Sequence, residues 1–523
     1  MRKLFFLLLI PASFLFPQNV PIQYNFDNYK LSKTNDATPT SNSIEKIIYE
    51  GNTLWLATGS GLSKSTDNGE TWTNYYKTRA FGEEGISAIG YHNGIIWAAT
   101  WHLEDKIGTP TPYGSGLRYS TDEGTTWHEV SQPVDQETDT VEVYGINKLK
   151  VLPVSYLDQN FVRQMAFTQN TIWIAASAGG LRKSTDMGQS WQRIVVPPDN
   201  LNSIKPTDTL DFSIGPPKGD AGNLNYIGYS VFAVNDSTIY FGTYGGGINK
   251  TTDGGKSWVK FNHENEEMPI GGTQIMDIAY NEFDKSIWAA TWKLFGDTEL
   301  WCISFSKDGG LSWETTLNDS RTFDFGFKYY GSPGNYTGVD IFAATEDGLY
   351  RSSNSGLTWI SAPTIIDDVT KQEITSREFR AVVPVPRIDN SYDIWIGSND
   401  GLARLNETNS NWTGNWKVFI ASNQKVSANE TFAFPNPFSP NNEVVRIKYK
   451  IESSSDVTIR IFDFGMNLVR TLIQNASRGA NDDQIEIWNG KDEKGKFVPN
   501  GVYFYRIDIG SNAPIFGKIM VIM

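Results

Sequence analysis

The stretch Ser65-Thr66-Asp67-Asn68-Gly69-Glu70-Thr71-Trp72 decides the fold, because its pattern, Ser/Thr-x-Asp-x-Gly-x-x-Trp, returns along the chain. Five octads match this pattern, and a sixth carries Asn354 in place of the aspartate. Repetition at a spacing of tens of residues is the signature of a fold built from similar units. The octads begin at Ser65, Ser120, Ser184, Thr251, Ser306 and Ser352, and they end at Trp72, Trp127, Trp191, Trp258, Trp313 and Trp359.

Each octad is preceded by a short segment in which large apolar residues alternate with small ones, as in Leu54-Trp55-Leu56-Ala57-Thr58. This period of two is typical of strands packed between neighbouring sheets. A seventh such segment, 394–398, runs on to Trp416 without an octad. Seven units of about four strands each predict an all-β fold, a seven-bladed β-propeller over residues 20–420. The other segments are 96–100, 172–176, 239–243, 287–291 and 341–345.

The octad residues suit a tight turn between the third and fourth strands of a unit. Glycine supplies a positive φ, the aspartate side chain caps backbone N–H groups, and the tryptophan buries its indole against the sheet. We therefore expect the octad carboxylates to be structural rather than catalytic. They belong to Asp67, Asp122, Asp186, Asp253 and Asp308.

The repeat resembles the Asp-box, or BNR, repeat of sialidases, sortilin-like receptors and xyloglucanases. In those families the boxes lie on the face away from the ligand, so the resemblance implies a ligand face at the other end of the sheets. Residues 21–43 precede the first full unit. Because a propeller closes by pairing its ends, we expect them to lend a strand to the seventh blade or to lie across it.

The composition of the chain changes after Trp416. Residues 421–430 form a polar linker, and five short apolar segments separated by glycines then predict a small Ig-like antiparallel β-sandwich over residues 431–523. The segments are 444–451, 456–462, 484–488, 501–509 and 515–522.

This C-terminal region resembles the FlgD-like immunoglobulin domain and the C-terminal sorting domain of the type IX secretion route. The resemblance rests on Pro435-Asn436-Pro437-Phe438, on Trp488-Asn489-Gly490-Lys491-Asp492 and on the segment 499–506. It implies that the secretion machinery carries the chain across the outer membrane of a Gram-negative cell. The alternative is a stalk domain with no sorting role.

The first residues predict export. Met1-Arg2-Lys3 and the apolar run 4–16 have the composition of a signal peptide, which we place at residues 1–19. No other segment is apolar enough to cross a bilayer, so no transmembrane anchoring is expected. The expected location is outside the cell or on the outer cell surface.

Charge and cysteine content exclude several classes of function. The chain has 45 basic and 59 acidic residues, a net charge of −14, which disfavours nucleic acid and anionic membranes as partners. The single cysteine, Cys302, rules out an intramolecular disulfide and a paired-cysteine metal site, and its apolar surroundings predict a buried thiol. The four histidines show no ligand spacing, and we expect neither a metal nor a cofactor.

The loops between second and third strands, on the expected ligand face, supply the candidate binding residues. Aromatic rings beside carboxylates often hold sugars, although strand-end aromatics are also commonly packed against neighbouring loops. The long crossings 132–160, 195–227 and 362–377 are expected to cover the same face. The candidates are Trp101, His102, Tyr244, Trp292, Glu346 and Asp347.

An enzymatic reading finds little support in these residues. A sialidase needs an arginine triad and an Arg-Ile-Pro opening that the chain lacks, and a xyloglucanase places its cleft between two propellers. The leading hypothesis is a non-enzymatic propeller that binds a protein or polysaccharide at the cell surface. A glycan-acting hydrolase is the alternative, and a scaffold packed against sister proteins is a third. A carboxylate pair facing one pocket would favour the hydrolase, and an aromatic rim without one would favour binding.

Overall fold

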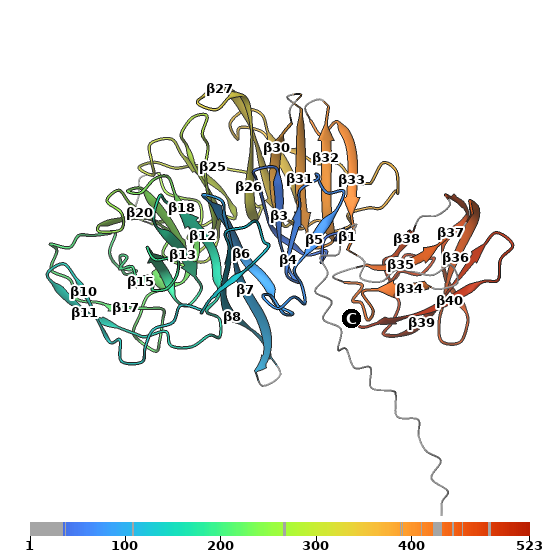
Figure 1. Ribbon diagram of the computed structural model, residues 1–523, viewed down its shortest axis with the longest axis horizontal. Coiled ribbons are helices and arrows are strands. Elements are labelled where there is room, and N and C mark those ends of the chain that lie inside the picture. Colours follow the sequence, from blue (N-terminus) through green and yellow to red (C-terminus); the bar gives the residue numbers. More distant parts are fainter. Residues whose placement is uncertain are drawn as a thin grey trace, which may run out of the picture. The chain divides into compact units, whose positions relative to one another are not determined.

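A computed structural model describes residues 35–36, 38–106, 109–264, 268–387, 389, 391–408, 411–421, 431–441, 444–451, 453–479 and 483–523. These residues form strands joined by turns, with a single turn of 3-10 helix at Leu224–Tyr226, so the all-β prediction is confirmed (Figure 1). Within these ranges, no helix has the length and apolar character needed to span a membrane. The predicted signal peptide and nearly all of the predicted linker lie outside the described residues.

Seven antiparallel sheets follow one another along residues 35–419, and each contains a meander of four consecutive strands (Figure 1). The first sheet contains β2 (Ile44–Glu50), β3 (Thr53–Thr58), β4 (Leu62–Ser65) and β5 (Trp72–Asn74). The second contains β6 (Gly85–His92), β7 (Ile95–Lys106), β8 (Thr109–Ser120) and β9 (His128–Val130). The third contains β12 (Val162–Phe167), β13 (Ile172–Ala176), β14 (Gly180–Ser184) and β15 (Gln192–Arg193).

The remaining four sheets repeat this order. The fourth contains β18 (Gly228–Ala233), β19 (Ile239–Thr243), β20 (Ile248–Thr251) and β21 (Trp258–Phe261). The fifth contains β22 (Gln274–Tyr280), β23 (Ile287–Trp292), β24 (Cys302–Ser306) and β25 (Glu314–Thr316). The sixth contains β26 (Thr322–Ser332), β27 (Asn335–Thr345), β28 (Gly348–Ser352) and β29 (Ile360–Ser361). The seventh contains β30 (Phe379–Pro386), β31 (Tyr392–Ser398), β32 (Gly401–Glu407) and β33 (Gly414–Phe419).

The sheets close into a ring through their first strands. The first strand of each sheet contacts the first strand of the next, and β30 of the last sheet contacts β2 of the first. This closed ring is the arrangement of a β-propeller. The seventh sheet takes its fourth strand, β33, from the C-terminal side of its own unit, so it needs no N-terminal strand. Accordingly β1 (Asn35–Asp36) pairs with β5 at the outer edge of the first sheet, which differs from the expected position on the seventh.

The octads form the turns between third and fourth strands, and their side chains are bonded within each turn. Ser65 Oγ donates to Asp67 Oδ1 over 2.9 Å and accepts from the backbone N–H of Gly69 over 2.8 Å. The carboxylate of Asp67 also accepts from the N–H of Thr71 (2.9 Å) and from its hydroxyl (2.6 Å). The same bonds recur at Asp122, Asp186, Asp253 and Asp308, and Asn354 replaces the carboxylate with its amide oxygen.

Both the backbone conformation of the octad turn and the neighbouring sheet require a glycine at this position. Gly69 has a φ of +84°, and a Cβ at this position would lie 2.6 Å from the indole of Trp395 in the seventh sheet. Gly124 and Gly356 approach the aromatic residue of the preceding sheet in the same way. Three octad tryptophans are buried, and three are half-buried. The buried ones are Trp72, Trp258 and Trp313, and the half-buried ones are Trp127, Trp191 and Trp359.

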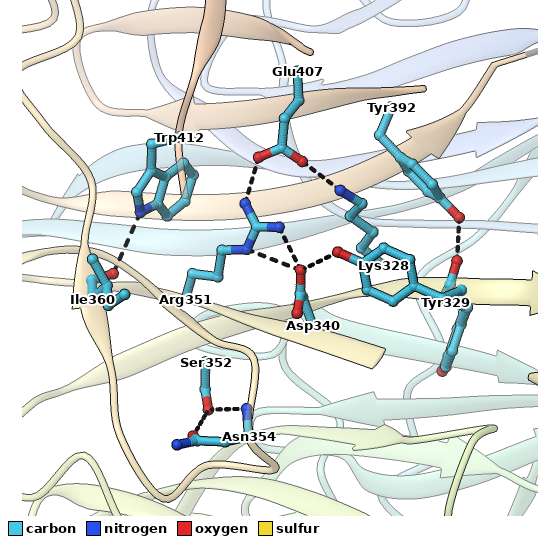
Figure 2. A network of polar contacts seen from close by, with 11 residues as sticks. Lys328, Tyr329, Asp340, Arg351, Ser352, Asn354, Ile360, Tyr392, Glu407 and Trp412 are labelled. Carbon is cyan, nitrogen blue, oxygen red and sulfur yellow. Dashed lines mark hydrogen bonds and ion pairs between the residues drawn. The ribbon is translucent and has the colours of Figure 1, made fainter. Parts of the chain in front are cut away.

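The seventh sheet lacks an octad, and a buried charge network joins it to the sixth (Figure 2). The guanidinium of Arg351 pairs with the carboxylates of Asp340 and Glu407. Lys328 Nζ lies 2.6 Å from the other oxygen of Glu407. These four side chains are at most 9% exposed, and their two positive and two negative charges cancel. Trp412 occupies the turn and packs edge-on against Phe342 of the sixth sheet.

The crossings that follow the second and third sheets only partly cover the expected ligand face. Their central parts form a small sheet, in which β10 (Val141–Tyr144), β11 (Asn147–Val151) and β17 (Ser213–Ile214) pair in that order. β16 (Ser203–Ile204) pairs with β21 at the outer edge of the fourth sheet. The small sheet shares a core with the third and fourth sheets, and Glu142 of β10 pairs with Arg193 of the fourth strand β15, so the small sheet lies at the outer edge of the third sheet.

Residues 431–523 form two antiparallel sheets around one core, which includes Tyr449, Trp488 and Tyr505. One sheet has the order β34 (Thr431–Phe434), β35 (Val445–Lys450) and β38 (Asp483–Trp488). The other has the order β37 (Leu468–Arg478), β36 (Ser455–Phe462), β39 (Gly501–Ile509) and β40 (Ile515–Val521).

Candidate functional site

Every first strand of the ring carries a β-bulge near its beginning. In β2, for example, Ile44 pairs with Thr58 and Lys46 pairs with Ala57, so Glu45 is one extra residue. A bulge adds twist and re-aims the side chain of its extra residue. The seven extra residues are Glu45, Ser87, Arg163, Tyr229, Met276, Phe323 and Arg380.

These seven bulge residues converge on one cavity of about 390 Å³, and all seven line it. Each of them is half-buried, whereas the residue before it in the chain is buried. Because strands alternate in direction, the start of each first strand and the octad turn lie at opposite ends of a sheet. We call this cavity, with its seven bulge residues, the channel mouth. It lies at the end of the ring opposite the octads.

A charged layer forms the floor of the channel mouth. Lys46 Nζ lies 2.5 Å from Asp324 Oδ1 and 3.6 Å from Asp277 Oδ2, and Gln164 Nε2 donates to Asp277 over 2.6 Å. Burial acts to lower the pKa of Lys46, but the two carboxylates outweigh it and the pKa lies above its ordinary value. Burial, opposed by Lys46 and reinforced by Asp324, raises the pKa of Asp277 to about 6.

Two arginines stand among the bulge residues, and their surroundings differ. Arg380 pairs with Glu378 (2.5 Å) and Glu45 (3.5 Å). Arg163 lies with its guanidinium carbon 3.9 Å from the ring centre of Tyr229 and 4.8 Å from that of Phe161. Its Nε donates to Ser177 Oγ over 2.6 Å, and it pairs with no carboxylate among the residues that the structure describes. Burial lowers the pKa of Arg163.

A groove of about 970 Å³ adjoins the channel mouth, and the two share Phe161, Arg163 and Tyr229. Its walls come from the ends of the two long crossings and from the extended β7–β8 hairpin, whose Lys106 pairs with Asp158 over 2.8 Å. Among its other lining residues are Tyr156, Pro216, Leu224 and Tyr244.

Two of the six predicted binding residues line these cavities. Trp101 lines the channel mouth and Tyr244 lines the groove. The other four have partners elsewhere. The ring of His102 contacts Ser115 and Glu104, and the indole of Trp292 donates to the carbonyl of Thr322. Glu346 pairs with Arg321 (3.1 Å), and Asp347 pairs with Arg377 (3.6 Å).

Sequence reasoning missed the bulge residues, although the sequence holds a signal for them. The residue paired opposite the start of the bulge is Thr or Ser in six sheets, and its hydroxyl donates to a carbonyl of the third strand or of the residue just before it. In β3 this residue is Thr58, which bonds the carbonyl of Gly61 over 2.6 Å. In six of the seven sheets, a hydroxyl residue at the end of the alternating segment therefore marks the bulge. The residues are Thr58, Thr100, Thr243, Thr291, Thr345 and Ser398.

Comparisons with known proteins find similarity to xyloglucanases. No family model matches the chain. The xyloglucanase Xgh74A of Acetivibrio thermocellus is 25% identical over 278 residues, which is 52% of this chain and 26% of that enzyme. A xyloglucanase of a Paenibacillus species is 26% identical over 278 residues, 52% of this chain and 21% of that one. The chain thus spans about a quarter of the length of these relatives.

Among solved structures, an ancestral GH74 enzyme superposes with a TM-score of 0.52 at 14% identity, over 93% of this chain and 63% of that one. At this identity the likeness is one of fold. It agrees with the closed ring of sheets and leaves the activity of the chain to be argued from its own residues.

Proposed function

We propose that this protein is an exported, seven-bladed Asp-box propeller that binds a protein or polysaccharide partner through the channel mouth and its adjoining groove. One observation carries this proposal: seven bulge residues, one from each sheet, converge on a single cavity that continues into an aromatic-lined groove. A rigid ring that presents aromatic faces beside polar groups is a typical binding surface.

The carboxylates of the site favour binding over catalysis. A hydrolase of this kind needs one carboxyl group to donate a proton and another to act as base or nucleophile. Glu45 pairs with Arg380, and Asp158 pairs with Lys106. Asp277 accepts from Gln164 and faces Lys46. Each carboxylate that lines the two cavities thus already has a partner.

A hydrolase is the second candidate, and Asp277 is the residue that favours it. A carboxyl group whose pKa is raised to about 6 can hold a proton near neutral pH, as a general acid must. The similarity to xyloglucanases points in the same direction. Release of reducing ends from xyloglucan by the purified chain, lost in Asp277→Asn, would establish the hydrolase in place of the binding protein.

The binding function is tested with a polysaccharide array and a pull-down of surface proteins, using the full chain. Trp101→Ala and Tyr244→Ala should each abolish capture of the partner, because both side chains line the proposed site. Leu357→Ala is the matched control, since Leu357 is 79% exposed in an octad turn at the other end of the ring. Capture that survives both aromatic substitutions would contradict the proposal.

For residues 431–523 we propose an Ig-like sorting domain that engages the type IX secretion machinery of a Gram-negative cell. The two sheets and their common core support a domain that folds as a sandwich. Deleting residues 431–523 should leave the propeller in the periplasm, as measured by fractionation and immunoblotting. Release to the medium at the level of the full chain would contradict the sorting role.

A further inference from the structure

Arg163 is the one charged side chain lining the channel mouth and groove that has no counter-ion among the described residues. Lys46 faces Asp277 and Asp324, Arg380 faces Glu45 and Glu378, and Lys106 faces Asp158. Each of these three cations thus has at least one carboxylate partner. Arg163 is therefore the cation of the two cavities that is left to pair with a carboxylate of a ligand.

The geometry of Arg163 leaves its hydrogen-bonding edge available. Its Nε is bonded to Ser177, and its planar face stacks on Tyr229. Stacking and the Ser177 bond fix the orientation of the guanidinium, while neither uses its two terminal nitrogens. A guanidinium held in this manner presents paired N–H donors to an approaching carboxylate, which can accept from two of them at once.

Holding an unpaired cation in a partly desolvated wall opposes folding, and an anionic ligand would remove that cost. Arg163 is also the residue that both cavities share with Phe161 and Tyr229. A ligand that runs from the groove into the channel mouth must therefore pass the guanidinium. Because Arg163 lies at this junction, it would discriminate among ligands by their charge.

We propose that the site recognises an acidic polysaccharide, with a sugar carboxylate bound by Arg163 and neighbouring sugar rings in the groove. This assignment rests on the proposed binding function and names its ligand class. A polysaccharide is favoured over an acidic peptide because four aromatic side chains line the groove, and aromatic side chains suit the faces of sugar rings. They belong to Tyr156, Phe161, Tyr229 and Tyr244.

The test is calorimetric titration of the full chain with hexagalacturonate and with its fully methyl-esterified form, which has the same backbone without the charges. The wild-type chain should bind the free acid about 10-fold to 100-fold more tightly than the ester, because a hydrogen bond to a charged group contributes on that scale. Arg163→Gln should bring the two affinities within about twofold of each other, and Arg163→Lys should restore part of the preference.

Lys307→Gln is the matched control, because it removes the same charge from an exposed position in an octad turn and should leave the preference unchanged. An Arg163→Gln chain that still prefers the acid as the wild type does would overturn the assignment. Tighter binding of hexaglutamate, lost in Arg163→Gln, would also overturn it in favour of an acidic peptide.

A different result would contradict the proposed binding function itself. If the ester binds and Tyr244→Ala abolishes its binding, the site is correct and only the charge preference is wrong. If Tyr244→Ala and Trp101→Ala leave binding of every probe intact, then the site itself is wrong. Thermal melts of each variant verify that lost binding does not reflect unfolding.

Discussion

The two ends of the ring use charged residues in opposite ways. At the octad end, carboxylates accept hydrogen bonds from their own turns, and the four charges between the sixth and seventh sheets cancel. At the channel mouth, the extra residue of every bulge is half exposed, and Arg163 has no counter-ion among the described side chains. The polar groups at the octad end are thus bonded within the fold, whereas the end that we propose as the binding site keeps one guanidinium without a counter-ion among the described side chains.

The largest loss of stability is expected when one carboxylate is removed from the buried charge network between the sixth and seventh sheets. Glu407→Gln leaves Arg351 and Lys328 buried with one carboxylate fewer, which should lower the free energy of unfolding by about 3–5 kcal/mol. Denaturant unfolding followed by tryptophan fluorescence measures this. The control is Glu314→Gln, an exposed position in β25. Equal stabilities for the two variants would contradict a structural role for the network.

The next effect concerns the octad glycine. Gly69→Ala should cost more stability than Gly94→Ala, although both positions have nearly the same φ, +84° and +80°. Each alanine pays about 1 kcal/mol or more for the left-handed backbone. Only at Gly69 does the new Cβ meet an indole at 2.6 Å, whereas Gly94 has open space. Equal losses in the same unfolding experiment would show that contact between sheets does not require glycine here.

A smaller effect on stability is expected at low pH, and it arises from the octad carboxylates. Hydrogen bonds from Thr126 and Ser120 lower the pKa of Asp122 to about 2, from an ordinary value of 3.8. Because the pKa of Asp122 is lower in the folded protein than in the unfolded chain, its carboxylate stabilises the fold at pH values above about 4. This contribution is lost as the pH falls from about 4 to 2. Asp122→Asn should therefore have nearly the wild-type denaturant midpoint at pH 7. Below pH 4 it should lose less stability than the wild type does.

Asn354 supplies the reciprocal test, because its amide oxygen accepts from the N–H of Thr358 as a carboxylate would. Asn354→Asp should steepen the loss of stability below pH 4. A variant that follows the wild-type curve throughout would contradict the role assigned to these turns.

The smallest effect on stability is expected at the channel mouth. Arg163→Met removes a charge without a partner and keeps an apolar side chain between Phe161 and Tyr229. The free energy of unfolding should stay within about 1 kcal/mol of the wild type. A loss comparable to that of Glu407→Gln, measured in the same way, would make Arg163 a structural residue and remove the contrast between the two ends.

The sequence predicts the octad end better than the channel mouth, and the reason is the range of the interactions involved. An aspartate, a glycine and a tryptophan within eight residues form a turn largely by themselves, so Asp67 and Gly69 could be placed from local chemistry. The position of β1 depended instead on which strand completes the seventh sheet, and β33 does so. In the C-terminal region β37 was missed, since its pairing with β36 shifts register repeatedly and blurs the alternation.

The candidate site illustrates the same limit. Trp101 and Tyr244 were accessible to prediction because each directly follows an alternating segment that is visible in the sequence. No single residue type is common to the bulge residues, as Glu45, Arg163 and Tyr229 show. Only closure of the ring brings them together. The pairing that leaves Arg163 without a counter-ion depends on side chains from several sheets, and spacing along the chain does not report it.

A crystal structure of the full chain with hexagalacturonate would show which end of the ring holds the ligand. We expect sugar rings along the groove and a carboxylate within hydrogen-bonding distance of the Arg163 guanidinium, with the octad turns unchanged. A ligand seated over the octad turns would contradict this expectation.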